Sequence, residues 1–445
     1  MFIEKILYPL MEKRRGNRVR ENTLSLKESE KYTAAQLKEY QSERLSELLV
    51  ECVKNVPKYQ GVAISEKDIL YNPYEALKKF PVTKKSDVVK DKESFVNKTY
   101  ARSSLIENNT GGSTGEPLRF YMDRKAVEQY EAARFRGLSW YDISFGSRSV
   151  MLWGNPVEMT KNEDKKYRLR EKYLKNRIML PAYNLKPDKL REYVEIINRY
   201  KPEYIYGYSS MLDTMAKMFE AQNLKLKISL KAVVSTSETL TQEQRENIGR
   251  VFSCSVVNEY GARDAGILAY ECPNGAMHII EENVYVEILD PVTLKEITDG
   301  SVGLIAVTDL TNYAMPRLRY ILGDIGSLSS DTCDCGRSSR LFSSIEGRED
   351  ALLVKRDGTL VHGHIVNHFA KLCHGIKQFR FVQKSVEYAE LIVVKKESET
   401  DDCDKFVSDI KEAFPGLEVN VAIAEDIPAA KSGKMKYTIR EFPLN

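Results

Sequence analysis

The chain has 445 residues, enough for two or more domains at about 100–200 residues per domain. Apolar residues make up 42% of the chain and charged residues 29%, which is typical of a globular enzyme, and no run of about 18 apolar residues could span a bilayer. The formal net charge of +3 is too small for a general nucleic-acid binder, so the composition argues against both a membrane-spanning chain and a nucleic-acid partner.

The first hundred residues are predicted to be mainly helical. In residues 1–20, apolar positions come first and the basic run Lys13-Arg14-Arg15 follows, which is the reverse of the order in a secretory signal. A short amphipathic helix packed on the body is the main interpretation, and a weak contact with a membrane surface or a partner is the alternative. Between residues 25 and 56, apolar side chains recur every three or four positions and predict helices with one buried face.

The middle of the chain alternates predicted strands with predicted helices. Short apolar runs bounded by turn residues predict strands at 150–153, 204–206, 232–234, 256–257, 284–289 and 303–308. Helical spacing predicts helices between several of them, at 188–199, 210–222 and 242–251. This alternation favours an α/β sheet with crossover connections.

A new series of predicted strands and helices begins at residue 351 and predicts a compact β/α unit of about 95 residues. Its expected elements are a strand at 351–354, a helix at 363–372, strands at 378–383 and 389–395, a helix at 403–414 and a strand at 418–424. We therefore expect a domain boundary near residues 348–350.

Seven cysteines, an odd number spread over a long chain, do not predict a disulfide framework and favour a reducing cytoplasm. Cys272 and His278 form one short-spaced pair of soft ligands, and Cys333 and Cys335 form another. Brought together, the four would suit a tetrahedral Zn²⁺, which would be structural because no position stays open for substrate. Buried packing cysteines are the alternative. The histidines at 362, 364, 368 and 374 are interpreted as packing or surface residues.

The sharpest local motif is the segment TGGSTGEP at residues 110–117. Its glycines let a backbone approach a phosphate closely, and its hydroxyl and N–H groups can donate to it. It is not a P-loop, because that motif requires Lys where Glu116 stands. A Gly/Ser turn between strands is the alternative for the isolated motif.

Four further motifs follow this loop in a recognisable order. They are NEYGARD at 258–264, RLRYILGD at 317–324, GRED at 347–350 and SGK at 432–434. With the loop at 110–117, they make the sequence resemble the adenylate-forming ligases, most closely the phenylacetate–CoA ligase branch and its capsule-locus (CapK-type) relatives. Five motifs in family order are far more specific than any one of them.

The resemblance implies an α/β fold with a large N-terminal adenylation domain, residues 1–347, and a small mobile α+β lid domain, residues 348–445. It implies ATP-dependent activation of a carboxylic acid to acyl-AMP with release of pyrophosphate, followed by acyl transfer to CoA or another acceptor. The acceptor stays open between CoA and an amine or sugar of a surface polysaccharide. A hydroxyl-directed adenylyltransferase and a non-catalytic nucleotide-binding relative are the rival functions. A homodimer is also left open.

The resemblance assigns the catalytic residues and the nucleotide site. Lys434 is the expected catalytic cation, and Asp350 is the hinge about which the lid would turn. Arg348 would hold the ribose together with Asp324, and Asp264, which stands where the family usually has Glu, would meet Mg²⁺. The other nucleotide-binding positions are Thr110, Gly111, Gly112, Ser113, Thr114 and Gly115 for the phosphates, and Ser235, Ser237, Glu238, Glu259, Tyr260 and Gly261 around the adenine.

The acid pocket is expected at the passage from a strand to a helix near residue 208. This passage would place Tyr208 and Ser209 at its carboxylate end, and Tyr206 is a further candidate for binding the substrate. Ser237 has an alternative interpretation as a loop residue or helix N-cap. Asp324 follows Gly323 after an apolar stretch and is expected in a turn, from which its carboxylate could accept from both ribose hydroxyls.

Overall fold

The computed structural model describes residues 6–110, 118–153, 165–182, 185–348, 352–396, 402–427 and 437–442. The chain divides into two compact units. The larger consists of Met1–Ile288, Glu296–Leu322 and Gly326–Ile345, and the smaller of Leu289–Lys295, Gly323–Ile325 and Glu346–Asn445. The main break, after Ile345, lies close to the boundary that the sequence predicts at 348, which itself stays a prediction.

The larger unit begins with helices α1 Tyr8–Arg15, α2 Val19–Ser29, α3 Ala34–Asn55, α4 Glu66–Tyr71, α5 Pro73–Leu77 and α6 Lys85–Lys90. Helix α3 begins at Ala34 because Thr33 and Gln36 form a capping box, in which the Gln36 N–H donates to Thr33 Oγ1 at 3.3 Å. The predicted amphipathic helix at the N-terminus is not fully packed on the body, since Ile6 and Leu10 are exposed.

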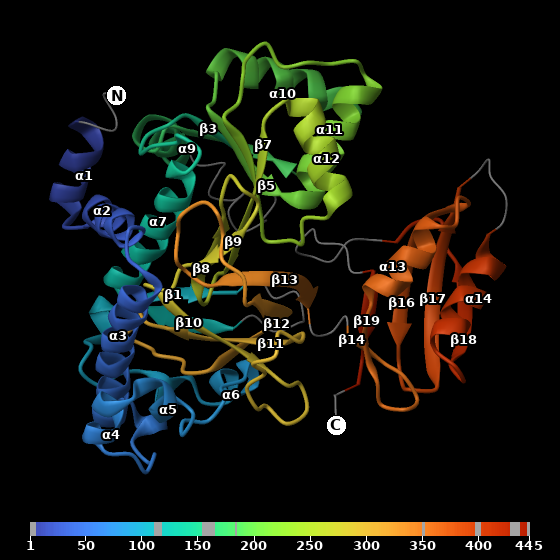
Figure 1. Ribbon diagram of the computed structural model, residues 1–445. Coiled ribbons are helices and arrows are strands. Elements are labelled where there is room, and N and C mark those ends of the chain that lie inside the picture. Colours follow the sequence, from blue (N-terminus) through green and yellow to red (C-terminus); the bar gives the residue numbers. More distant parts are fainter. Residues whose placement is uncertain are drawn as a thin grey trace. The chain divides into compact units, whose positions relative to one another are not determined.

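An eleven-stranded sheet forms the centre of the larger unit, with the strand order β10-β11-β12-β13-β9-β8-β7-β6-β5-β3-β4 (Figure 1). Strands β3 to β7 run parallel, whereas β8 is antiparallel to β7 and to β9, and β9 is antiparallel to β13. A separate hairpin pairs β1 Ile106–Asn109 with β2 Arg119–Met122. The bounds in the sheet are β3 Ser149–Trp153, β4 Arg177–Pro181, β5 Tyr204–Tyr208, β6 Ala232–Thr236, β7 Ser255–Ala262, β8 Gly266–Glu271, β9 Met277–Ile279, β10 Val284–Leu289, β11 Gly303–Asp309, β12 Tyr320–Ser329 and β13 Leu341–Arg348.

Helices cover both faces of the parallel strands, because successive side chains of a strand point to opposite faces. Ile205 and Val233 pack with helices α10 Pro187–Tyr200, α11 Ser209–Ala221 and α12 Gln242–Phe252, which gather on one side in Figure 1. Their chain neighbours Tyr206 and Val234 belong to another core cluster, with residues of α2 and α7 Arg124–Ser139. Helix α9 Lys165–Leu174 precedes β4.

The smaller unit is an α+β fold. Its four-stranded sheet has the order β18-β17-β16-β19, and a hairpin pairs β14 with β15. Phe381, Leu391 and Phe406 are fully buried in its core. Its elements are β14 Leu352–Val354, β15 Leu360–His362, α13 His364–Lys371, β16 Ile376–Gln383, β17 Tyr388–Lys395, α14 Cys403–Ala413, β18 Glu418–Ile423 and β19 Thr438–Arg440.

Every strand and helix that the sequence predicts from residue 150 onward has a counterpart of the same kind whose ends lie within five residues of the predicted ends. Strands β8, β9, β12 and β13 are additional, and the antiparallel pairings of β8, β9 and β13 make the sheet a mixed one. Among the described helices, none combines the length and the hydropathy that a membrane crossing would require.

Candidate active site

Several of the predicted site residues lie at the carboxyl ends of neighbouring parallel strands. Trp153 ends β3, Tyr208 ends β5 and Thr236 ends β6, while Tyr260 and Gly261 lie near the end of β7. Parallel strands present these ends at a single edge of the sheet, and open α/β sheets bind their ligands there.

Tyr206, expected in the acid pocket, is buried and donates its hydroxyl to Oε1 of Glu259 at 2.5 Å. Burial raises the pKa of the Tyr206 hydroxyl well above its usual range, so the group stays a donor at neutral pH. Tyr208 stacks on Trp153 with ring centroids 4.4 Å apart. Ser209 is the first residue of α11, and its Oγ lies 2.7 Å from that of Ser235.

Glu259 is buried among protein partners from three elements. Arg134 of α7 approaches its Oε2 at 3.2 Å, and the hydroxyl of Thr236 lies 3.4 Å from its Oε1. With Tyr206, these contacts occupy both carboxylate oxygens and join α7, β5, β6 and β7. Their geometry supports a positioning role for Glu259. Sequence reasoning missed Arg134, which lies 125 positions away and carries no local motif.

The segment predicted to wrap the adenine continues β6. Ser235 is fully buried within that strand, and Ser237 has a left-handed backbone with φ of 67°. Oε2 of Glu238 accepts from the backbone N–H of Ser210 at 2.9 Å, which satisfies a donor at the start of α11. The N-cap of α12 is Thr241, so the alternative interpretation of Ser237 as a helix cap is wrong.

Thr110 closes the base of the predicted phosphate loop. Its N–H donates to the Leu118 carbonyl at 2.9 Å, and its Oγ1 accepts from the Leu118 N–H at 3.0 Å. Arg263 of the NEYGARD motif donates to the carbonyl of Asn109 at 3.2 Å. The ends of the loop are therefore fixed by the β1–β2 hairpin, while Gly111, Gly112, Ser113, Thr114 and Gly115 lie outside the described residues.

Tyr260, the residue expected beside the adenine, packs edge to face on Phe342 of β13, with ring centroids 5.6 Å apart. Gly261 follows it at an irregularity in the β7–β8 pairing. A Cβ at position 261 would lie 2.6 Å from the backbone oxygen of Gly266, so the close approach of the two strands requires glycine.

Asp264 connects two of the motifs directly. Its Oδ2 accepts from the Tyr320 hydroxyl at 2.8 Å, and its backbone carbonyl accepts from Arg317. Arg317 is buried and lies over the ring of Phe120 at 4.9 Å. A carboxylate is a hard oxygen donor of the kind that Mg²⁺ takes alongside water and phosphate oxygens, so Asp264 fits its expected role chemically.

The turn predicted at Asp324 is wrong, since this residue lies inside strand β12. Gly323 before it has φ of 77°, and this left-handed backbone interrupts the strand locally. Arg348 ends β13 and places Nη1 3.2 Å from Oδ1 of Asp324. The two predicted ribose-binding residues are thus brought together. Asp350 and Lys434 lie outside the described residues.

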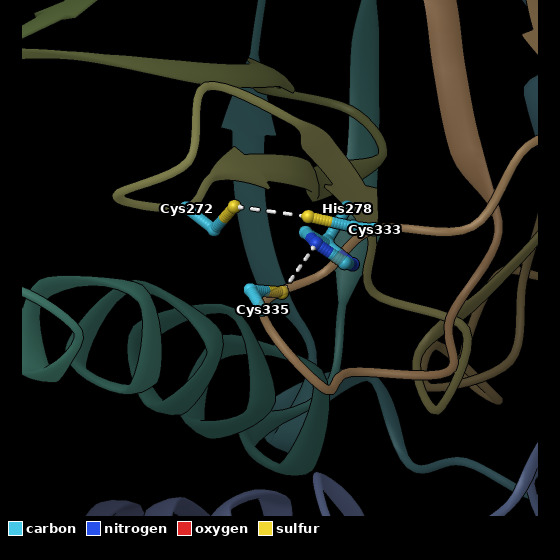
Figure 2. A group of neighbouring side chains, drawn as sticks. All are labelled: Cys272, His278, Cys333 and Cys335. Carbon is cyan, nitrogen blue, oxygen red and sulfur yellow. Dashed lines mark hydrogen bonds between the residues drawn. The ribbon is translucent and has the colours of Figure 1, made fainter.

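The four predicted zinc ligands also come together (Figure 2). Their ligand atoms all lie within 4.8 Å of one another, with Sγ of Cys272 3.7 Å from Sγ of Cys333 and Sγ of Cys335 3.2 Å from Nε2 of His278. Burial lowers the pKa of His278 to about 4, so its imidazole is neutral at physiological pH. Three thiols and a neutral imidazole are a donor set that fits Zn²⁺.

Comparison with known proteins agrees with this geometry. Residues 353–441 match the family model of the CapK C-terminal domain. Protein CapK of Staphylococcus aureus is 24% identical over 82% of this chain and 80% of its own, and a phenylacetate-coenzyme A ligase of Thermus thermophilus is 26% identical over 72% of each. A 2-hydroxyisobutyryl-CoA ligase in the postadenylation state superposes with a TM-score of 0.71 at 17% identity, over 92% of this chain and 91% of its own.

In fold and in sequence, the chain is similar to adenylate-forming ligases. The predicted resemblance to the phenylacetate–CoA ligase and CapK branch is confirmed. The predicted fold class is also confirmed, with a mixed α/β body and a small C-terminal domain. The roles of the individual site residues stay predictions. The structure adds that several of these residues lie close to one another.

Proposed function

We propose that this chain uses ATP to convert a carboxylic acid into an acyl-adenylate, releasing pyrophosphate, and then transfers the acyl group to CoA. The observation that carries the proposal is the direct contact between two motifs, in which Tyr320 of RLRYILGD donates to Asp264 of NEYGARD. Asp264 follows the end of β7, at the edge where open α/β sheets bind their ligands.

The nucleotide would lie along this edge. Tyr260, supported by Phe342, offers an aromatic face to the adenine. Asp324 would accept from the ribose hydroxyls while Arg348 steadies its carboxylate from 3.2 Å. The loop that follows Thr110 would donate backbone N–H and hydroxyl groups to the phosphates.

Adenylation brings an anionic carboxylate to an anionic α-phosphate, so positive charge must offset the repulsion. Lys434 would supply that charge from the lid, with Asp350 as the hinge about which the lid turns between the two half-reactions. Mg²⁺, when bound, would neutralise phosphate charge, with Asp264 as the protein ligand. The acid would lie near Tyr208 and Ser209, beside the stacked ring of Trp153.

A second acceptor class is favoured by one specific observation. The matched family model is the CapK C-terminal domain, and it covers the small unit that we expect to rearrange before acyl transfer. An amine or sugar acceptor is therefore the alternative to CoA. In either case the acceptor would attack the acyl carbonyl, and AMP would leave.

ATP–pyrophosphate exchange screened over carboxylic acids tests the first half-reaction. We expect exchange that depends on one class of acid, followed by AMP release when CoA is added. Transfer of AMP to a hydroxyl compound, without exchange on any acid, would replace the proposal with a hydroxyl-directed adenylyltransferase. ATP binding without either reaction would indicate a non-catalytic relative. AMP release with amines or sugars, but not with CoA, would select the alternative acceptor.

A further inference from the structure

The Cys272, His278, Cys333 and Cys335 cluster joins two connections that are far apart in the sequence. Cys272 and His278 flank the turn between β8 and β9, whereas Cys333 and Cys335 lie between β12 and β13. All four point toward a common centre in Figure 2. Zn–S bonds of about 2.3 Å place two tetrahedral sulfur ligands about 3.8 Å apart, close to the 3.7 Å between Cys272 and Cys333.

The imidazole of His278 is already oriented for such an ion. Its Nδ1 lies 3.0 Å from Oγ of Ser339, while its Nε2 faces Sγ of Cys335. A metal-binding histidine commonly holds its second nitrogen in this way, because the outer hydrogen bond fixes the tautomer and the ring orientation. The ring is buried and packs against Trp140 in a T-shaped arrangement with ring centroids 5.9 Å apart.

The cluster also lies beside a short strand pairing. Strands β9 and β13 share two residue pairs, Leu341 with His278 and Phe342 with Met277. Next to them, the side chain of Arg340 donates to Glu281 at 2.6 Å. A pairing of two residues is weak by itself, so a cross-link at its end would add substantially to its order.

This pairing positions a residue of the nucleotide site. Phe342, paired with the neighbour of His278, is 5% exposed and packs edge to face on Tyr260. In the sheet, β9 and β8 lie between β13 and β7, the strand of Tyr260. Phe342 therefore carries the support of β13 across these two strands to the ring of Tyr260. If the β9–β13 pairing became less ordered, the ring of Tyr260, which we assign to the adenine, would also become less ordered.

We propose that Cys272, His278, Cys333 and Cys335 bind one structural Zn²⁺, which clamps β9 to β13 and thereby holds Phe342 behind Tyr260. The metal site stands on its own geometry, whereas the effect on the adenine rests on the function proposed above. Phe342 is a positioning residue in this scheme, since it acts through Tyr260.

Metal analysis of the full chain, purified without chelator, tests the site independently of catalysis. We expect about one Zn per chain, and we expect Cys333→Ser to lose the metal and lower the thermal midpoint. Cys254→Ser is the matched control, because Cys254 is a free, half-buried thiol of the same unit outside the cluster. Protein that holds no zinc, and takes none up when titrated with Zn²⁺, would overturn the site.

Thiol titration of the unfolded, metal-free chain excludes a competing explanation for the short sulfur distances. We expect all seven cysteines to react. Five reactive thiols would show a disulfide within the cluster and would also overturn the metal site.

The clamp is tested by comparing ATP with inorganic tripolyphosphate, which lacks the adenine. We expect Cys333→Ser and Phe342→Leu to weaken ATP binding about three- to tenfold, the range of an aromatic contact, and to leave tripolyphosphate within twofold of wild type. Equal ATP affinity in Cys333→Ser and Cys254→Ser, with zinc lost only from the former, would overturn the clamp. Wild-type protein that holds zinc but binds no ATP would refute the proposed function and the clamp, and leave the metal site standing.

Discussion

Tyr206→Phe should destabilise the larger unit and leave the affinity for the acid nearly unchanged. The substitution removes only the hydroxyl, which donates to Oε1 of Glu259 at 2.5 Å in a buried setting. A hydrogen bond to a charged group contributes about 1.5–3 kcal/mol, so we expect the free energy of unfolding to fall by that amount. Arg134 still pairs with Glu259 in the Tyr206→Phe variant, and this pairing limits the loss of stability.

Urea unfolding followed by tryptophan fluorescence measures this loss in the relevant unit. Both tryptophans of the chain, Trp140 and Trp153, belong to the larger unit. The midpoint should shift without a change in the denaturant dependence. Tyr200→Phe is a matched control, because its hydroxyl donates to the neutral Oδ1 of Asn176 at 3.1 Å and should contribute only about 0.5–1.5 kcal/mol.

A double-mutant cycle with Glu259→Gln identifies the partner of the hydroxyl. In the Gln background, Tyr206→Phe should cost about 0.5–1.5 kcal/mol, because the acceptor is then neutral. Equal costs in both backgrounds would refute the assignment. An unchanged free energy of unfolding with a raised KM for the acid would show instead that the hydroxyl serves the substrate.

Three further substitutions test the nucleotide site. Lys434→Ala should slow acyl-AMP formation about 100-fold or more while transfer from supplied acyl-AMP stays near wild type, and equal loss in both assays would contradict the role. Asp324→Ala should weaken ATP and AMP more than the acid in calorimetry, because each lost hydrogen bond to a charged acceptor is worth about 1.5–3 kcal/mol. Gly323→Ala should weaken ATP as well, because its Cβ would lie 2.8 Å from Nη2 of Arg348, whereas Gly358→Ala, at φ of 84° in open space, should not.

The sequence alone was sufficient for the crossover part of the fold and for the list of motifs. Short apolar runs such as 232–234 and helical spacing such as 242–251 are local patterns, and β6 and α12 follow them closely. The order of the five motifs likewise predicted a resemblance to the phenylacetate–CoA ligase and CapK branch, which the comparisons confirm.

Tertiary structure decided how these residues are used, because contacts between distant positions leave no local trace. Asp324 lies in a strand because β12 pairs within the sheet, although its Gly-Asp sequence predicts a turn. Glu259 and Arg134 are in contact although they are 125 positions apart in the sequence. Phe342 contacts Tyr260 because of the antiparallel strands that the sequence did not predict. The spacing of the cysteines suggested a metal site, but only the fold brings Sγ of Cys272 to 3.7 Å from Sγ of Cys333. The two pairs of ligands are far apart in the sequence, and they come together because the strands that carry them are neighbours in the sheet.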